Sequence, residues 1–171
     1  MHPTEILSHE HRVIQNMLDQ LEEETRGIAA GRPLSRDFFD QALDFFRNFA
    51  DGCHHAKEEN LLFPRMKERG VPEAGGPIGV MLAEHRQGRA YLKGIRENLD
   101  AAAGGEEPAR QIVLANASGY IAMLRAHIQK EDNILFRMAR MVLEPDDVAE
   151  LACDFAAVEI PQRFQELAAC R

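Results

Sequence analysis

The chain has 171 residues, of which 45% are hydrophobic and 28% charged, and its formal net charge at pH 7 is −8. The length is sufficient to bury an apolar core, and the composition is that of a globular protein in water. The negative charge and the lack of a basic stripe argue against a nucleic-acid partner, and no apolar run is long enough to span a membrane.

Four long amphipathic helices are predicted, because apolar residues recur at three- and four-residue steps between glycine- and proline-rich breaks. In chain order they span about residues 4–27, 35–64, 78–103 and 108–142. Thr4 and Ser35 are suitable caps for the first two helices, and Pro64 and Gly70 mark the end of the second. Helices of about 25 residues with short loops predict an all-α fold, an antiparallel up-down four-helix bundle over about residues 3–142.

The residues from about 143 to 171 follow the bundle. Glu144-Pro145-Asp146-Asp147 is typical of a helix start, since proline suits the first turn and acids suit its positive end. Pro161 is expected to kink or divide this helix. We therefore predict an extra C-terminal helix that covers the bundle, and a single domain over residues 1–171.

Two motifs occur twice. Glu10-His11-Arg12 is followed, 43 residues after His11, by the block 54–63, and Glu84-His85-Arg86 is followed, 42 residues after His85, by the block 127–136. The two blocks share six of ten residues, so the bundle is predicted to consist of two similar hairpins related by an approximate two-fold axis. The arginines Arg12 and Arg86 are expected to pair with Glu10 and Glu84 near the helix surface.

Each block places a histidine and a glutamate on one helix face. His54 and Glu58 are four residues apart, as are His127 and Glu131, which stacks each pair one turn apart. Both glutamates continue apolar stripes and should point inward. The acidic residues that follow them are turned by about 100° and should face a boundary or solvent: Glu59 and Asp132.

Four histidines and two carboxylates on apolar faces favour a metal site. A single histidine on such a face is more often a hydrogen-bonded core residue, and a His–Glu pair is often a helix-surface pair. An unpaired buried carboxylate is costly, however, and a duplicated set costs more unless cations compensate for it. Imidazole with carboxylate suits first-row metals such as iron, and the absence of cysteine ligands argues against structural zinc.

These motifs resemble the hemerythrin-like (HHE cation-binding) family over nearly all of residues 3–142. The resemblance rests on Glu10-His11-Arg12, His54-His55-x-x-Glu58-Glu59-x-x-Leu62-Phe63-Pro64, Glu84-His85-Arg86 and His127-x-x-x-Glu131. It implies a four-helix bundle with a non-haem centre of two iron ions. The implied terminal ligands are His11, His54, His85 and His127. The implied bridging carboxylates, beside an oxo or hydroxo bridge, are Glu58 and Glu131.

The sequence departs from the family's oxygen carriers in two places. They carry a histidine four residues after the third-helix histidine, where this chain has Arg89. They also use an aspartate five residues after the last histidine, which would be Asp132 here, although periodicity favours Glu131. His55 is a candidate to replace the missing ligand; its alternative is a boundary role. Reversible oxygen carriage therefore does not follow from the resemblance, because a changed ligand set alters the iron site.

The expected function is non-enzymatic: binding or sensing dioxygen or a related small oxidant at two irons. The alternatives are turnover of peroxide or nitric oxide at the same irons, iron handling or iron sensing, and a purely structural metal. Neither nucleic acid nor a membrane is an expected partner, and a homodimer is left open. Three sparse cysteines and an N-terminus without a signal-peptide pattern favour the reducing cytoplasm: Cys53, Cys153 and Cys170.

Overall fold

The computed structural model describes residues 1–169, so Cys170 and the end of the predicted C-terminal extension lie outside it. The described chain is helical without a strand, which confirms the all-α prediction. The first and third bundle helices are α1 (Pro3–Ala29) and α4 (Pro77–Ala103). The second consists of α2 (Arg36–Phe45), the π-helical segments η1 (Phe46–His55) and η2 (Glu58–Leu62), and α3 (Phe63–Glu68). The fourth consists of α5 (Glu107–Lys130), the π-helical η3 (Glu131–Leu135) and α6 (Phe136–Val142).

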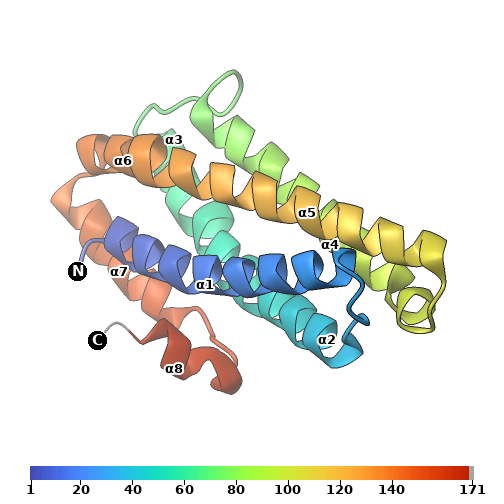
Figure 1. The fold of residues 1–171 in the computed structure, drawn as a ribbon. Helices are drawn as coiled ribbons and strands as arrows, with labels where there is room; N and C mark the ends of the chain where they lie inside the picture. Colours follow the sequence, from blue (N-terminus) through green and yellow to red (C-terminus); the bar gives the residue numbers. More distant parts are fainter. Residues whose placement is uncertain (170–171) are drawn as a thin grey trace.

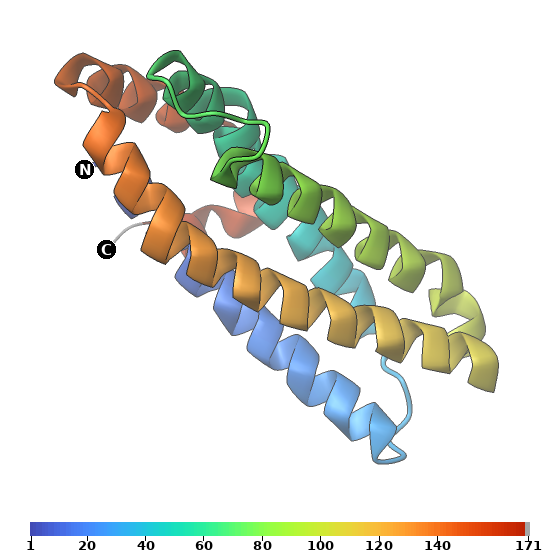
Figure 2. The same ribbon diagram turned by 90° about the horizontal axis from the view of Figure 1, so that it is seen from above.

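The four bundle helices lie side by side in an antiparallel arrangement (Figure 1). Figure 2 shows the same bundle from above, with the chain reversing direction at each connection. This is the up-down bundle that the helix lengths and short loops predict. None of the described helices is both long and apolar enough to cross a membrane.

Two details of the helix ends differ from the prediction. The cap of α1 is His2, whose Nδ1 accepts a hydrogen bond from the Thr4 amide at 3.2 Å, because Pro3 already occupies the first turn. Pro64 does not end the second helix. It lies in the first turn of α3, directly after the π-helical η2, and the helix continues to Glu68. The chain turns away at Gly70, whose φ of 91° is the left-handed conformation that glycine adopts without strain.

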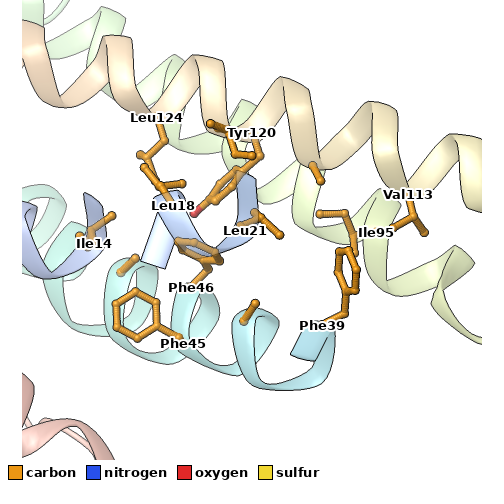
Figure 3. Packing of buried hydrophobic residues seen from close by; sticks show 14 of the residues in the cluster. Ile14, Leu18, Leu21, Phe39, Phe45, Phe46, Ile95, Val113, Tyr120 and Leu124 are labelled. Atoms are coloured by element: carbon orange, nitrogen blue, oxygen red, sulfur yellow. The ribbon is translucent and has the colours of Figure 1, made fainter. Parts of the chain in front are cut away.

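The apolar core has two parts with a polar layer between them. The larger cluster fills the half of the bundle around Tyr120 and Phe46, whose rings meet edge to face at 4.9 Å (Figure 3). The smaller cluster contains Leu62, Phe63 and their neighbours at the other end. Along every bundle helix the candidate site residues come between the two clusters. That layer is therefore shielded from water at both ends.

The chain after the bundle covers it, as predicted. It forms α7 (Pro145–Ala157), the 3-10 turn η4 (Gln162–Phe164) and the short α8 (Gln165–Ala168). Phe155 of α7 joins the smaller cluster, whereas Phe164 packs against Phe45 and Phe49 of the larger one. Pro161 separates the two segments, which confirms its predicted dividing role.

Asp147 attaches α7 to the bundle. Only 2% exposed, it accepts hydrogen bonds from Arg65 at 2.7 Å, from Arg69 at 2.7 and 2.9 Å, and from the Glu144 amide at 2.9 Å. Hydrogen bonds from Arg69 and then Arg65 lower the pKa of Asp147 far below its ordinary value. Its contribution to stability is thus complete above the unfolded pKa and is lost as the pH falls toward the folded one.

We predict that Asp147→Asn lowers the melting temperature at pH 7, since both arginines lose their charged acceptor. The melting temperature of the unchanged protein should fall between about pH 5 and pH 2, and the variant should show a shallower fall over that range. Thermal unfolding monitored by circular dichroism measures both effects. Asp146→Asn on the exposed side of α7 is the control, and an Asp147→Asn curve equal to it would contradict the attachment role.

Candidate metal centre

The structure brings all seven predicted site residues into two overlapping groups. The first consists of His11, His54, Glu58 and Glu131. The second consists of His55, Glu58, His85 and His127. Within each group the candidate ligand atoms lie within 4.8 Å of one another, and every member is buried. Because Glu58 belongs to both, the groups form one continuous centre contributed by all four bundle helices.

Each inner carboxylate contacts a histidine from both hairpins. Glu58 Oε1 lies 3.5 Å from Nε2 of His54, and its Oε2 lies 3.5 Å from Nε2 of His85. Glu131 Oε2 lies 3.1 Å from Nε2 of His11 and 3.3 Å from Nε2 of His127. This is the arrangement that a carboxylate shared between two cations requires, and it follows the approximate two-fold axis of the sequence repeat.

The other ring nitrogen of every histidine in the centre contacts an outer carboxylate. An Nδ1–H that donates to a carboxylate fixes the tautomer, so that Nε2 keeps its lone pair for the centre. Four of these bonds come from the duplicated histidines, and the fifth comes from His55. The partners and distances are Asp132 for His11 (3.0 Å), Glu10 for His54 (3.0 Å), Asp51 for His55 (3.2 Å), Glu59 for His85 (2.7 Å) and Glu84 for His127 (2.9 Å).

Sequence reasoning missed the roles of Glu10 and Glu84. The expected surface pairs with Arg12 and Arg86 are wrong for Glu10, which is 2% exposed and bonded to His54 and Lys57. Glu84 repeats the pattern with His127 and Lys130. The reason is that the position before each histidine faces the adjacent helix of its own hairpin. The signal was present in the repeat, since the glutamates and the lysines are both duplicated.

The π-helical segments coincide with the site residues. His54 and His55 end η1, Glu58 begins η2, and Glu131 begins η3. In a π-helix the amide bonds to the carbonyl five residues back, so each turn holds more residues than an α-turn. The widened turn allows the consecutive His54 and His55 to be buried together, at 1% and 5% exposure. A single α-helical period does not place two neighbours on one inner face.

The charges of the centre are poorly compensated by protein atoms alone. Burial and the adjacent Glu131 raise the pKa of Glu58 well above its ordinary value. Burial also opposes ionisation of Glu131, but His127 and His11 outweigh it and hold the pKa of that carboxyl well below its ordinary value. Burial lowers the pKa of His54 to about 4, whereas at His127 the adjacent Glu131 and Glu84 outweigh burial and raise the pKa to about 9. His54 thus favours its neutral form, and His127 favours its charged form beside Glu131.

Unpartnered buried atoms test whether these residues fit a metal. Among the described residues, five buried side-chain atoms lack a hydrogen-bond partner: His9 Nε2, His54 Nε2, both oxygens of Glu58 and Oε1 of Glu131. Buried polar atoms are rarely left so, and all of these except His9 Nε2 belong to residues of the two groups. Nitrogen and oxygen donors without thiolate suit first-row cations. The donor set therefore fits the metal ions that the sequence motifs imply.

Comparison with known proteins agrees with a cation-binding site in the bundle. The model of the Hemerythrin HHE cation binding domain matches residues 2–139. An uncharacterized protein of Mycobacterium tuberculosis H37Rv is 26% identical over 162 residues, which covers 95% of this chain and 62% of that protein. No solved structure gives a significant match.

Two shorter matches are to proteins that are named for a role. The iron-sulfur cluster repair protein YtfE of Escherichia coli O157:H7 is 33% identical over 88 residues, covering 50% of this chain and 40% of that protein. The protein of the same name from Edwardsiella ictaluri is 35% identical over 100 residues, covering 57% of this chain and 44% of that protein. The chain thus spans about three fifths or less of the length of these curated relatives.

Replacing Glu58 is expected to separate stability from metal binding. Glu58→Gln removes a buried acid that has no partner, so the metal-free variant should melt about 2–4 °C higher, the effect of about 1 kcal/mol in a chain of this size. Its affinity for iron should fall by more than about tenfold. Calorimetry of both forms measures this. The control is Glu59→Gln, a half-buried residue that should not stabilise the metal-free chain, and a metal-free Glu58→Gln that melts lower than wild type would contradict the account.

Proposed function

Since the chain belongs to the hemerythrin HHE cation-binding domain family, we propose that it holds two iron ions and binds or senses dioxygen or a related small oxidant. The observation that carries this proposal is the set of unpartnered donor atoms enclosed between two histidine groups that share Glu58. One enclosed cation would leave part of that donor set without a partner. Two cations would give the whole donor set a partner, and they would agree with the two-fold symmetry of the repeat.

The proposal assigns each site residue a place. Glu58 and Glu131, each of which faces histidines of both hairpins, would be shared by the two ions. His11 and His54 would hold one ion, and His55, His85 and His127 would hold the other. When bound, two adjacent non-haem irons supply electron exchange with small oxidants. His55 thereby takes the role that is open because Arg89 stands four residues after His85.

The surrounding chain keeps this centre ordered and dry. Phe136 stacks on the His11 ring at 5.4 Å, and Phe63 stacks on His85 at 6.1 Å. These aromatic rings belong to the smaller apolar cluster and cover the end of the centre that faces it. With the Nδ1 bonds to carboxylates, they fix each ring in position and orientation. A preorganised, water-poor site of this kind favours binding of a small apolar molecule.

Binding is favoured over catalysis by the state of the nearby acids. Within residues 1–169, the carboxylates in contact with the centre's histidines are either the inner pair or the five outer acceptors, which are occupied by Nδ1–H donors. Tyr120 is buried, and burial raises its pKa far above the ordinary value. General acid–base catalysis requires a group that can give or take a proton at the reacting atoms. The five outer carboxylates are occupied in holding the histidines, and Tyr120 keeps its proton.

Two alternative functions would use the same centre. Turnover of peroxide or nitric oxide would use the same irons, and steady-state consumption by the iron-loaded protein, abolished in His127→Ala, would favour it. Iron handling is supported by the likeness to relatives named for iron-sulfur cluster repair. It predicts rapid transfer of iron to an acceptor protein. Slow iron release together with a spectral response to oxygen would favour the binding role.

We predict about two irons per chain in protein purified after expression with iron, and a visible spectrum that bleaches on reduction and returns in air. His127→Ala should lose at least one iron, because it removes a donor from the second group. Elemental analysis and absorbance spectroscopy measure both. His9→Ala is the control, since His9 lies on α1 outside both groups. One iron or fewer in the unchanged protein, or a spectrum indifferent to oxygen, would reject the proposal.

A second variant tests His55 separately. The repeat pairs His55 with Ile128, so His55→Ile restores the residue that the chain itself uses at the symmetric position. As a ligand, His55 should contribute to iron affinity, and its loss should weaken binding at one site by about 10–100-fold and shift the visible absorption. Competition with a chelator of known affinity measures the loss. Wild-type affinity and spectrum would show that His55 only packs beside His85.

A further inference from the structure

The sequence repeat is inexact beside the two groups. Residues of α1 and α4 correspond at an offset of 74, and those of the second and fourth bundle helices at 73. The duplicated histidines, the inner glutamates and the lysines obey these offsets. Several residues beside the second group differ from their counterparts, among them Gly88 from Ile14, Arg89 from Gln15, and His55 from Ile128.

The substitutions leave space on one side only. A cavity of about 10 Å³ touches His55, His85 and His127 of the second group and is also lined by Gly88 and Tyr120. That volume is about the room that one water-sized molecule needs. A Cβ at position 88 would lie 3.0 Å from the Met123 methyl and 3.4 Å from the Tyr120 ring, so the glycine keeps the space open.

The corresponding positions beside the first group are filled. Ile14 and Ile128 are each 1% exposed and belong to the larger apolar cluster. Leu18, the counterpart of Leu92, is fully buried in the same cluster. The two groups therefore have similar donors and unlike surroundings: one is enclosed by branched apolar side chains, and the other borders a small cavity.

An outer groove lies between the protein surface and this cavity. It has a volume of about 480 Å³ and lies between the second bundle helix and α4. Asp51, Arg89 and Leu92 line both the groove and the inner cavity, so these side chains separate the two spaces. The groove offers water and small solutes a path to within one side-chain layer of the second group.

Arg89 is the residue at the boundary. Its guanidinium donates to Asp51 at 2.9 and 3.0 Å and to Glu59 at 2.8 Å. Those acids hold the Nδ1 atoms of His55 and His85. The arginine side chain is 41% exposed, so solvent screens its ion pairs. The hydrogen bonds from His55 and His85 to these acids do not use Arg89, so they can persist when the guanidinium moves away.

We propose that the groove and the cavity form the access route by which a molecule the size of dioxygen or nitric oxide reaches the centre at its second group, and that Arg89 closes this route. The inference rests on the proposed function, because it requires a small ligand that binds at the centre. It specifies the side of the centre from which the ligand arrives and the residue that controls its access. The positions that correspond to Gly88 and His55 hold the buried Ile14 and Ile128.

The test uses nitric oxide as a neutral diatomic probe. Reduced, iron-loaded protein is mixed with it in a stopped-flow spectrometer, and the second-order rate constant of the absorbance change is measured. Gly88→Ile installs the residue of the first hairpin and should slow the reaction by about tenfold or more, with Gly88→Ala intermediate. Arg89→Gln installs the other residue of that hairpin and should speed it by about threefold.

Matched controls lie on the same helix. Gln87→Ile adds the same side chain at an exposed position, and Arg86→Gln removes a charge from an exposed one; both should react like wild type. Iron content and melting temperature are measured for every variant, so that a slow rate in a fully loaded, folded protein reports access alone.

The outcomes separate the two proposals. Wild-type protein that holds fewer than two irons or shows no change with nitric oxide rejects the proposed function. Fully loaded Gly88→Ile and Gly88→Ala that react as fast as Gln87→Ile overturn the access route. Arg89→Gln that reacts no faster than Arg86→Gln overturns the closing role of Arg89.

Discussion

Two carboxyl groups buried between apolar clusters determine how the surrounding side chains are arranged. Glu58 and Glu131 are completely buried, and three of their four oxygens have no hydrogen-bond partner among the described residues. Such groups are destabilising unless a positive charge lies close to them. In the proposed centre they are donors to the cations, which links the binding of metal to the stability of the fold.

Charge alternates outward from that pair. The inner carboxyls face histidine Nε2 atoms, and the histidine Nδ1 atoms face the outer carboxylates. Four of the five outer carboxylates in turn contact basic side chains: Lys57 on Glu10, Lys130 on Glu84, and Arg89 on Asp51 and Glu59. Each layer partly compensates the charge of the one inside it. This order explains why Lys57 is only 2% exposed in a core that is otherwise apolar.

The sequence predicted what depends on periodicity along one helix, and it missed what depends on contacts between helices. The doubled histidines and glutamates lie on inward faces of single helices, so their spacing predicted six of the residues that the structure brings together; His55 was added as a candidate for a missing ligand. Glu10 and Glu84 are buried only because another helix of the hairpin packs beside them, and a helical wheel of α1 or α4 alone does not show that. The π-helical turns were also missed, since the burial of both His54 and His55 requires a backbone register that composition does not encode.

The repeat and its exceptions serve different purposes. Duplicated residues give the two groups of histidines and glutamates nearly equal donors, as a symmetric bundle built from two hairpins would. A symmetric centre with symmetric surroundings would expose both groups equally or neither. The chain instead has Ile14 and Ile128 where the repeat places Gly88 and His55, and the second group borders a cavity. The symmetric part of the sequence thus supplies the shared donors, and the asymmetric part gives the two groups different surroundings.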